Sequence, residues 1–376
     1  MSKTQKIHGL ISNFKHKQRA RKLRRPHLHV VPEGARPAPK TPSLTAKYPF
    51  YGLLGDLLRV IMPHTEADQM AIASQFLAGI ANLIGRGPHF NVGPTEHHLV
   101  LYIALVGTSS RARKTTALDV VFEILRGIDE IWEAHCQAGG LSSGEGLIAR
   151  VRDRDQSGTD DDDGEGPAVT DKRLFVVETE LAQPLIVMRR PGNTLSTVLR
   201  RLWDRGRAET LVKKNPIKTT DAHVSLVGHI TRDELLPNLK REKKNGLANR
   251  FLWFFVKRSK DLPSGGHLPA DELAPLILRL KKVVAFARTV GEMQRSKKAE
   301  KLWRRLYSRL LEEHPERAPT VEKLRDRATA HVMRMACVIA LLDMKSTVMV
   351  QHIKAAMAMW EQVEASIDLI FTRQNR

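Results

Sequence analysis

The stretch from Gly107 to Thr116 contains residue types that hold nucleotide phosphates. It follows an apolar run over residues 99–106, long enough for one buried strand, and a helical pattern comes after it. A phosphate-binding loop needs backbone amides at a helix N-terminus, a lysine that reaches the terminal phosphates and a hydroxyl group for magnesium. Gly107, Lys114 and Thr115 would supply the turn, the charge and the hydroxyl, and Thr116 adds a second hydroxyl. The order strand, loop, helix therefore predicts a phosphate-binding loop.

The spacing of this loop departs from the usual pattern G-x-x-x-x-G-K-[ST]. That pattern places the lysine six positions after the first glycine, whereas Lys114 stands one position further from Gly107. Arg113 also occupies the position of the second glycine. We therefore interpret the segment as a variant phosphate loop.

Two acids follow the next apolar run, which predicts a buried strand over residues 174–177. We expect this strand to lie beside the loop strand, so that Glu178 at its tip holds the shell of a magnesium ion. A neighbouring acid such as Glu180 would then orient water for attack on the γ-phosphate. Acids at the end of a strand can also simply be exposed. Because these acids come after a phosphate loop in the chain, we favour the functional interpretation.

Two further strands are predicted over residues 223–230 and 251–256. His229 and Thr231 at the tip of the first could sense a γ-phosphate, although capping of a following helix explains the threonine equally well. Arg250 stands at the mouth of the second strand. It could act as an arginine finger, in the same chain or across a subunit interface. Its alternative role is to anchor a helix C-terminus or a carboxylate.

Helical patterns surround these strands. Together they predict an α/β fold with a mostly parallel sheet and the site at the carboxyl ends of its strands. The Pro- and Gly-rich residues 261–269 indicate a boundary, beyond which the chain is expected to be helical. Arg327 and Arg334 in that part could reach a nucleotide, and their default role is to form ion pairs at the edge of the helical bundle. The expected helices cover residues 53–61, 65–84, 118–132, 299–311, 332–342 and 350–371.

The charge of the chain favours a polyanionic partner. Sixty-one Lys and Arg residues against 41 Asp and Glu give a net charge of +20, and half of it lies in residues 1–40. Nucleic acid is the polyanion that such a balance suits best, and a solubilising tail is the alternative. Residues 1–45 are expected to form a disordered basic arm.

Membrane and metal classes are disfavoured by the same composition. No apolar run is long enough for a membrane span and no secretory signal core is visible, so we expect a cytoplasmic protein without a membrane partner. Cys136 and Cys337 are far apart and show no metal-type spacing.

The chain resembles the uncharacterised RecA-like P-loop ATPases of phages, plasmids and integrated elements, many known only as a domain of unknown function. These proteins are often fused to or encoded beside primase domains and are similar to hexameric plasmid replicative helicases. The resemblance covers roughly residues 48 to 372 and includes a loop that commonly departs from the standard motif. It is carried by the segments VGTSSRARKTT, GGLSSGEGLI, LFVVETEL, TLSTVLRRLWD, HVSLVGHITRDEL, NGLANRFLWFFVKRS and RATAHVMRMA.

The resemblance implies a RecA-like P-loop core over residues 99–262, preceded by an N-terminal helical segment over 46–98 and followed by a C-terminal helical bundle over 263–376. It implies ATP and Mg²⁺ as cofactors, with phosphate contact by Gly107 and Lys114 and magnesium ligation by Thr115. Acidic roles fall to Glu178 and Glu180. Glu145 falls where RecA-like enzymes often keep the glutamate that activates water, and whether Glu145 or Glu180 does so stays open.

We therefore expect an ATP-hydrolysing, helicase-like protein that acts on DNA in mobile-element replication. Its DNA partner would be single-stranded and bound without sequence specificity. A homo-oligomeric ring would follow if Arg250 works across a subunit interface, and priming would need a separate primase partner. Two alternatives stay open: a DNA-binding or loader protein that has lost hydrolysis, motivated by Arg113 and the long loop, and a nucleotide-dependent host-defence effector.

Overall fold

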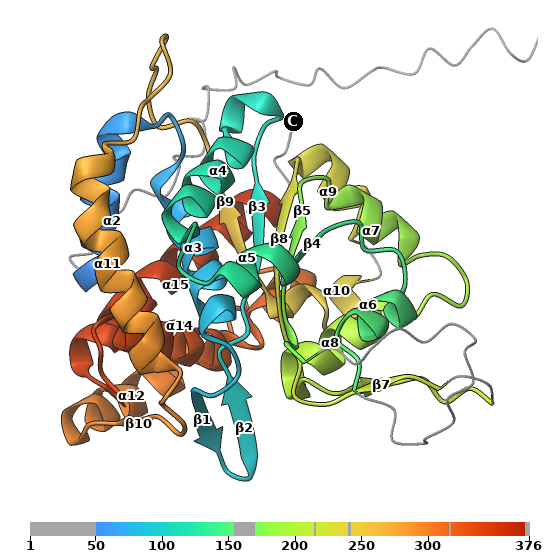
Figure 1. Cartoon of the computed structure of the whole chain (residues 1–376). Coiled ribbons are helices and arrows are strands. Elements are labelled where there is room, and N and C mark those ends of the chain that lie inside the picture. Colours follow the sequence, from blue (N-terminus) through green and yellow to red (C-terminus); the bar gives the residue numbers. More distant parts are fainter. Residues whose placement is uncertain (1–49, 154–169, 214–215, 240–241, 316, 373–376) are drawn as a thin grey trace, which may run out of the picture. The chain divides into compact units, whose positions relative to one another are not determined.

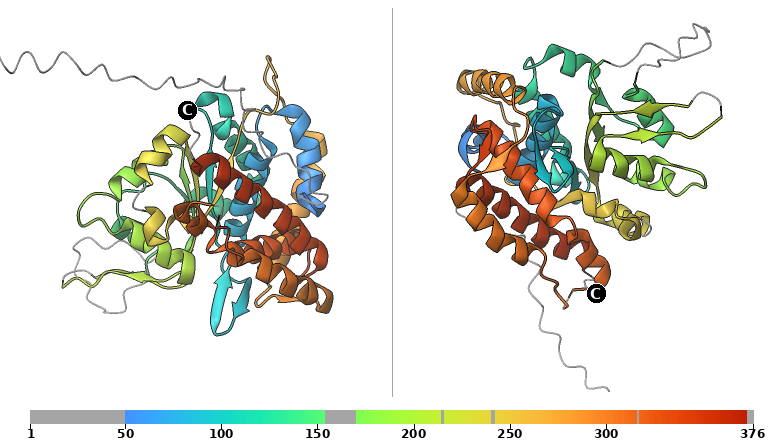
Figure 2. Two further views of the ribbon diagram at one scale, coloured as in Figure 1. Left: turned by 180° about the vertical axis from the view of Figure 1, so that it is seen from behind. Right: turned by 90° about the horizontal axis from the view of Figure 1, so that it is seen from below.

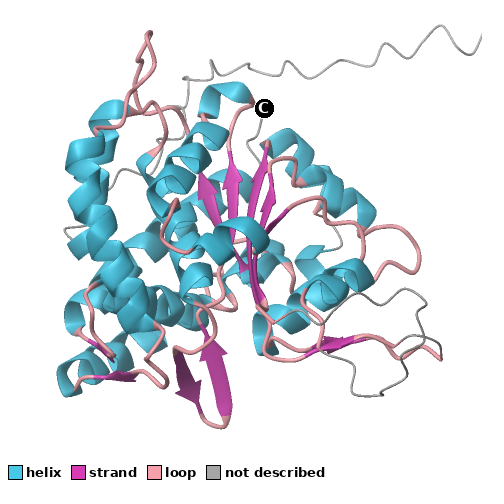
Figure 3. Cartoon of the chain, viewed as in Figure 1, coloured by secondary structure: helices cyan, strands magenta, loops and turns pink. Residues whose placement is uncertain are grey.

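A parallel β-sheet lies at the centre of the computed structural model, which describes residues 50–153, 170–213, 216–239, 242–315 and 317–372 (Figure 1). Within these ranges the sheet has five strands in the order β4-β5-β8-β3-β9. All neighbouring strands run parallel, as the arrows of Figure 3 show. The strands are β3 (Tyr102–Val106), β4 (Gln137–Ala138), β5 (Arg173–Glu178), β8 (His223–Ile230) and β9 (Phe251–Phe255).

The middle strands are apolar because helices cover both faces of the sheet. Every residue of β3 and β8 is buried, as expected for a parallel sheet. On one face lie α3 (Gln69–Ile84) and α4 (Lys114–Leu125), and the Phe122 ring of α4 meets that of Phe175 edge to face. On the other face lie α8 (Leu195–Arg205) and α15 (Val350–Phe371), which crosses β9 in the view from behind (Figure 2).

Further helices and three small hairpins or strand pairs surround this core. All described residues belong to one compact unit. The antiparallel pairs are β1 (His89–Val92) with β2 (Thr95–His98) and β6 (Ala208–Glu209) with β7 (Lys218–Thr219), and β10 (Gln294–Arg295) pairs in parallel with β11 (Thr347–Val348). The other helices are α2 (Gly52–Ile61), α5 (Glu130–His135), α6 (Gly144–Arg150), α7 (Ala182–Val187), α9 (Arg232–Asn238), α10 (Glu242–Asn245), α11 (Ala270–Ala287), α12 (Lys297–Leu310), α13 (Pro319–Glu322) and α14 (Ala328–Leu342), with single 3₁₀ turns at Met62–His64, Ser110–Ala112, Ala248–Arg250 and Lys323–Arg325.

The α/β class and the mostly parallel sheet predicted from the sequence are confirmed. The expected position of the acidic strand is wrong. We expected β5 to lie beside the loop strand β3, but β8 pairs with both and separates them. The single helix expected over residues 118–132 is also wrong, because the chain turns at Gly127, which has a φ of 66°, and α5 follows as a separate helix. The basic arm expected over residues 1–45 lies outside the described residues.

Candidate nucleotide site at the carboxyl ends of the strands

The carboxyl ends of β3, β5 and β8 bring several predicted site residues to one side of the sheet. Gly107 directly follows β3, and its amide donates to the Ile230 carbonyl at the end of β8 (N–O 3.2 Å). A Cβ atom at Gly107 would lie 2.6 Å from the Val256 carbonyl oxygen and 2.7 Å from the Ala112 Cβ. Only glycine therefore fits where the loop leaves the strand.

Arg113 has a backbone conformation that glycine adopts more readily than other residues. It precedes α4 with φ 51° and ψ 35°, in the left-handed region that glycine enters without steric cost. Its Nε donates to Glu66 Oε2 at 2.6 Å, and Glu66 Oε1 accepts from the Leu262 amide at 2.8 Å. Leu262 and Arg113 hold the pKa of Glu66 below its ordinary value. The ion pair thus fixes an arginine where the sequence pattern calls for glycine.

Lys114 folds back over the loop that precedes it. Its Nζ donates to the Thr108 carbonyl at 3.0 Å, and burial of the half-exposed side chain lowers its pKa. Thr115 is exposed and Thr116 is half-buried in the first turn of α4. No side chain caps this helix, so its first-turn amides are available to an anion. The lysine lies at the same loop and is available to the same anion.

Glu178 is held by the connection between β4 and α6 rather than by the loop. Its Oε1 accepts from the Leu141 amide at 2.6 Å. Burial raises the pKa of Glu178, and the neighbouring charge of Glu180 raises it further, while the Leu141 and Gly140 amides oppose both. Glu180 is exposed and accepts from the Thr179 hydroxyl at 2.6 Å.

Glu145 lies at the start of α6, close in sequence to the amides that hold Glu178. Its carboxylate is exposed and accepts from the Thr194 hydroxyl in front of α8 at 2.8 Å. Ser143 caps α6 by accepting from the Gly146 amide. The connection between β4 and α6 therefore contacts one candidate acid, Glu178, and leads into the helix that carries another, Glu145.

His229 on β8 is a buried imidazole beside the loop lysine. Its Nε2 pairs with Gln75 Oε1 of α3 at 2.8 Å, while its Nδ1 is buried without a partner among the described residues. Burial lowers the pKa of His229 to about 4, and the charge of Lys114 contributes to that shift. The imidazole is therefore neutral at pH 7. Gln75 was not identified as a candidate site residue from the sequence. It stands within an apolar helix, and its spacing from other polar residues forms no recognisable motif.

Thr231 takes the capping role that was one of its two sequence interpretations. Its hydroxyl accepts from the Glu234 amide, and the Glu234 carboxylate accepts from the Thr231 amide, which makes a capping box at the start of α9. The charge of Glu234 raises the pKa of Lys114 against the effect of burial. Glu234 is thus a second residue near the lysine that the sequence did not single out.

Arg250 directly precedes β9, at the end of the sheet where the parallel strands begin. The loop at residues 107–116 lies at the opposite end of these strands. It is buried, its Nη2 donates to Asp204 at 2.5 Å, and its Nη1 donates to the Gly246 carbonyl. The structure therefore does not bring Arg250 to the loop within one chain, and it shows the carboxylate contact of the alternative interpretation. Arg327 pairs with the same Asp204 at 3.2 Å.

Arg334 completes this group and is fully buried. It donates to the Val100 and Trp203 carbonyls at 2.8 and 3.0 Å, and its guanidinium lies 3.6 Å from the centre of the Trp203 ring. Arg334 and Arg327 therefore hold α14 against the start of the sheet, away from residues 107–116.

The described residues contain no cluster of three His, Cys, Asp or Glu side chains that would by itself hold a metal ion. A magnesium ion bound through one hydroxyl and phosphate oxygens needs no such cluster. None of the described helices has both the length and the hydrophobicity that crossing a membrane requires. No protein-family model matches the chain, and no curated protein sequence matches it.

Proposed function

We propose that the chain binds ATP with Mg²⁺ at residues 107–116 and hydrolyses it as a helicase-like protein acting on DNA in mobile-element replication. The observation that carries the proposal is the conformation of Arg113, which gives the loop a glycine-like turn directly before Lys114. The strand order is compatible with a RecA-like core and adds support. The family resemblance of the sequence supports the RecA-like P-loop core, the DNA partner and the separate primase.

The roles of the loop follow from its geometry. The amides of the first turn of α4 and the Lys114 ammonium would bind the phosphates, since nothing in the helix itself satisfies those amides. The Thr115 hydroxyl is exposed and would serve as a magnesium ligand. Bound magnesium neutralises charge that develops on the phosphates during transfer.

Three carboxylates are candidates for holding magnesium or orienting water. Glu178 is buried at the end of β5, which raises its pKa, and a cation bound beside it would favour the charged carboxylate. Glu180 and Glu145 are exposed and each accepts one hydroxyl, from Thr179 and Thr194. We assign Glu178 to the magnesium shell and keep Glu145 and Glu180 as the two candidates for the water. Single Gln variants of each would separate them, since only the water-orienting residue should abolish turnover while nucleotide binding stays intact.

The proposed ring no longer depends on Arg250. That side chain is buried against Asp204, so a finger across a subunit interface would have to come from another residue. Single-stranded DNA remains the proposed partner, bound without sequence preference.

The test is ATP binding and turnover by the wild-type chain and by Lys114→Ala, with and without single-stranded DNA. Lys301→Ala, an exposed lysine on α12, is the matched control. Turnover that DNA stimulates and Lys114→Ala abolishes would support the motor. Binding without turnover in the wild type would favour the non-hydrolysing loader, which the replacement of glycine by Arg113 motivates. Turnover indifferent to DNA would favour the defence effector, and equal inactivity of wild type and variant with no binding would refute the proposal.

A further inference from the structure

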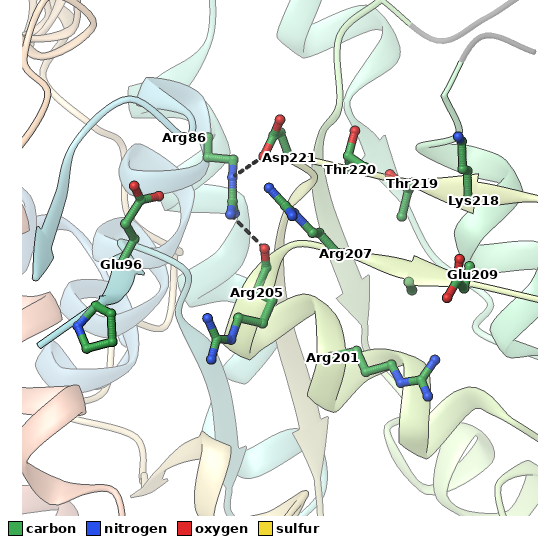
Figure 4. A pocket seen from close by; sticks show the side chains of 12 residues that line it. Arg86, Glu96, Arg201, Arg205, Arg207, Glu209, Lys218, Thr219, Thr220 and Asp221 are labelled. Atoms are coloured by element: carbon green, nitrogen blue, oxygen red, sulfur yellow. Dashed lines mark hydrogen bonds and ion pairs between the residues drawn. The ribbon is translucent and has the colours of Figure 1, made fainter. Parts of the chain in front are cut away.

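A basic cavity lies where the parallel strands begin, away from the nucleotide loop. Its volume is about 540 Å³, within the range of small-molecule and nucleotide sites and far larger than one phosphate needs. Five cations and three acids line it, together with Pro94, Ala208, Thr219 and Thr220. The cations are Arg86, Arg201, Arg205, Arg207 and Lys218, and the acids are Glu96, Glu209 and Asp221 (Figure 4).

Arg86 builds the wall of this cavity. Its Nη2 donates to the Arg205 carbonyl at 2.7 Å, its Nη1 donates to the Ala222 carbonyl at 3.2 Å, and its Nε lies 3.5 Å from Asp221. Gly206 ends α8 with a φ of 64°, and a Cβ there would lie 2.2 Å from Arg86 Nη1. The glycine therefore makes room for the guanidinium that joins the end of α8 to the start of β8.

The remaining cations are exposed and have no ion pair among the described residues. Arg201 and Arg205 are four residues apart on α8, so they lie on one helix face, and Arg207 follows the end of that helix. Lys218 stands opposite Glu209 in the β6–β7 pair. Among the three acids, Asp221 has a charged partner in Arg86. Glu96 contacts His98 at 3.2 Å, but burial lowers the pKa of His98 to about 4, so Glu96 keeps its charge at pH 7. Five cations still outnumber the three acids. The free charge of the cavity is therefore positive.

Exposed apolar side chains continue the basic surface beyond the cavity. Leu211 and Val212 follow β6 with 91% and 54% of their surfaces exposed. A single strand of nucleic acid presents phosphates that would contact the cations and base faces that would contact the aliphatic side chains. A small anion would leave cations spread over α8, its C-terminal end and β7 without a partner.

We propose that this cavity binds the phosphate backbone of single-stranded nucleic acid, with Arg201, Arg205, Arg207 and Lys218 contacting successive phosphates. The assignment of the ligand to a nucleic acid rests on the proposed function, but binding here requires neither ATP nor hydrolysis. The cavity lies next to the start of β8, at Asp221, and the Ile230 carbonyl at the end of β8 accepts from the Gly107 amide of the loop, so β8 runs from one site to the other.

The test is binding of a fluorescent oligothymidylate to the full chain over a series of salt concentrations, without nucleotide. In Arg201→Gln/Arg205→Gln two phosphate contacts are lost, so the slope of log K against log salt should fall by about 1.4. Near 1 M salt the contribution of these two contacts should vanish, so the variant and the wild type should bind with equal affinity. At 0.1 M salt the variant should therefore bind about 25-fold more weakly than the wild type. Lys218→Gln, on a different element, should lower the slope by about 0.7.

The matched control is Lys281→Gln/Lys282→Gln, which removes two exposed charges from α11 and should leave the slope unchanged. An unchanged slope in both the α8 and the β7 variants, or an equal fall in the control, would overturn the proposal. A further outcome is that tripolyphosphate stabilises the wild type but not the α8 variant, while both bind the oligonucleotide with the same affinity. That result would show a site for a small polyanion and would also overturn the proposal. Lys114→Ala should bind the oligonucleotide with the affinity of the wild type. Loss of ATP turnover therefore tests the proposed function, and loss of oligonucleotide binding tests the cavity.

Discussion

Replacement of Arg334 tests how strongly one buried cation holds the C-terminal helices against the sheet. The side chain has no exposed surface, and no carboxylate is hydrogen-bonded to it among the described residues. Burial lowers the pKa of its guanidinium. The two carbonyl contacts to Val100 and Trp203 join α14 to the residues before β3 and to α8. We expect Arg334→Met to destabilise the chain even though methionine removes a buried charge.

The magnitude follows from the groups left behind. Each of the two carbonyls loses a charged donor, at a cost of about 1 to 3 kcal/mol for a buried acceptor without a partner. The contact between the guanidinium and the Trp203 ring adds up to about 2 kcal/mol in a desolvated site. The relief of desolvation offsets part of this sum. The net loss in the free energy of unfolding should be about 3 to 5 kcal/mol.

Urea unfolding followed by circular dichroism measures this difference. Arg305→Met, on the exposed face of α12, is the matched control and should stay within about 0.5 kcal/mol of the wild type. Arg334→Lys keeps the charge but cannot reach both carbonyls with a planar fork, so it should fall between the wild type and Arg334→Met. A loss below about 1 kcal/mol for Arg334→Met would refute the argument, since the two carbonyl contacts would then contribute nothing net.

Two further predictions concern the loop and the buried histidines. Arg113→Val should lower the free energy of unfolding by about 1 to 2 kcal/mol because a β-branched residue is strained at φ 51°, whereas Arg113→Gly should stay within about 1 kcal/mol of the wild type; both variants lose the Glu66 contact, so urea unfolding that finds valine as stable as glycine would contradict the backbone argument. Burial lowers the pKa of His229 to about 4 and that of His331 to about 3, so the unfolded chain binds the protons first and stability should fall as pH drops from about 6.5 towards 4. Between pH 6.5 and 5 the loss should be smaller in His331→Gln by up to about 2 kcal/mol, and equal losses in variant and wild type would contradict this assignment.

Four of the five described strands of the central sheet were predictable from the sequence because each is an apolar run that ends on polar residues. The edge strand β4 was missed, since Gln137 and Ala138 form no apolar run. The run from His223 to Ile230 matches β8 residue for residue. The order of the strands was not predictable in the same way. It depends on which run pairs with which across the whole chain, and nothing within the runs containing Phe175 or Ala104 indicates that β8 lies between them.

The sequence predicted the positions of those candidate site residues whose type alone indicates their chemistry. Lys114 and Thr115 stand at the start of a helix after a strand, as their types and positions indicated. The left-handed conformation of Arg113 and its ion pair with Glu66, a residue 47 positions away, were not predictable, because neither the residue type nor the local spacing indicates them. Arg250 was assigned two roles for the same reason, since only the fold places it beside Asp204.

The parallel pairing of the sheet has a consequence for how the chain folds. Tyr102 on β3 pairs with Leu226 and Phe251, so β3 has no neighbour in the sheet until more than half of the chain has been synthesised. Non-local pairing of this kind slows folding, and an apolar strand that waits for its partners is prone to associate with other chains. Production of the protein should therefore depend on slow synthesis, low temperature and chaperones more than on the stability of the finished fold.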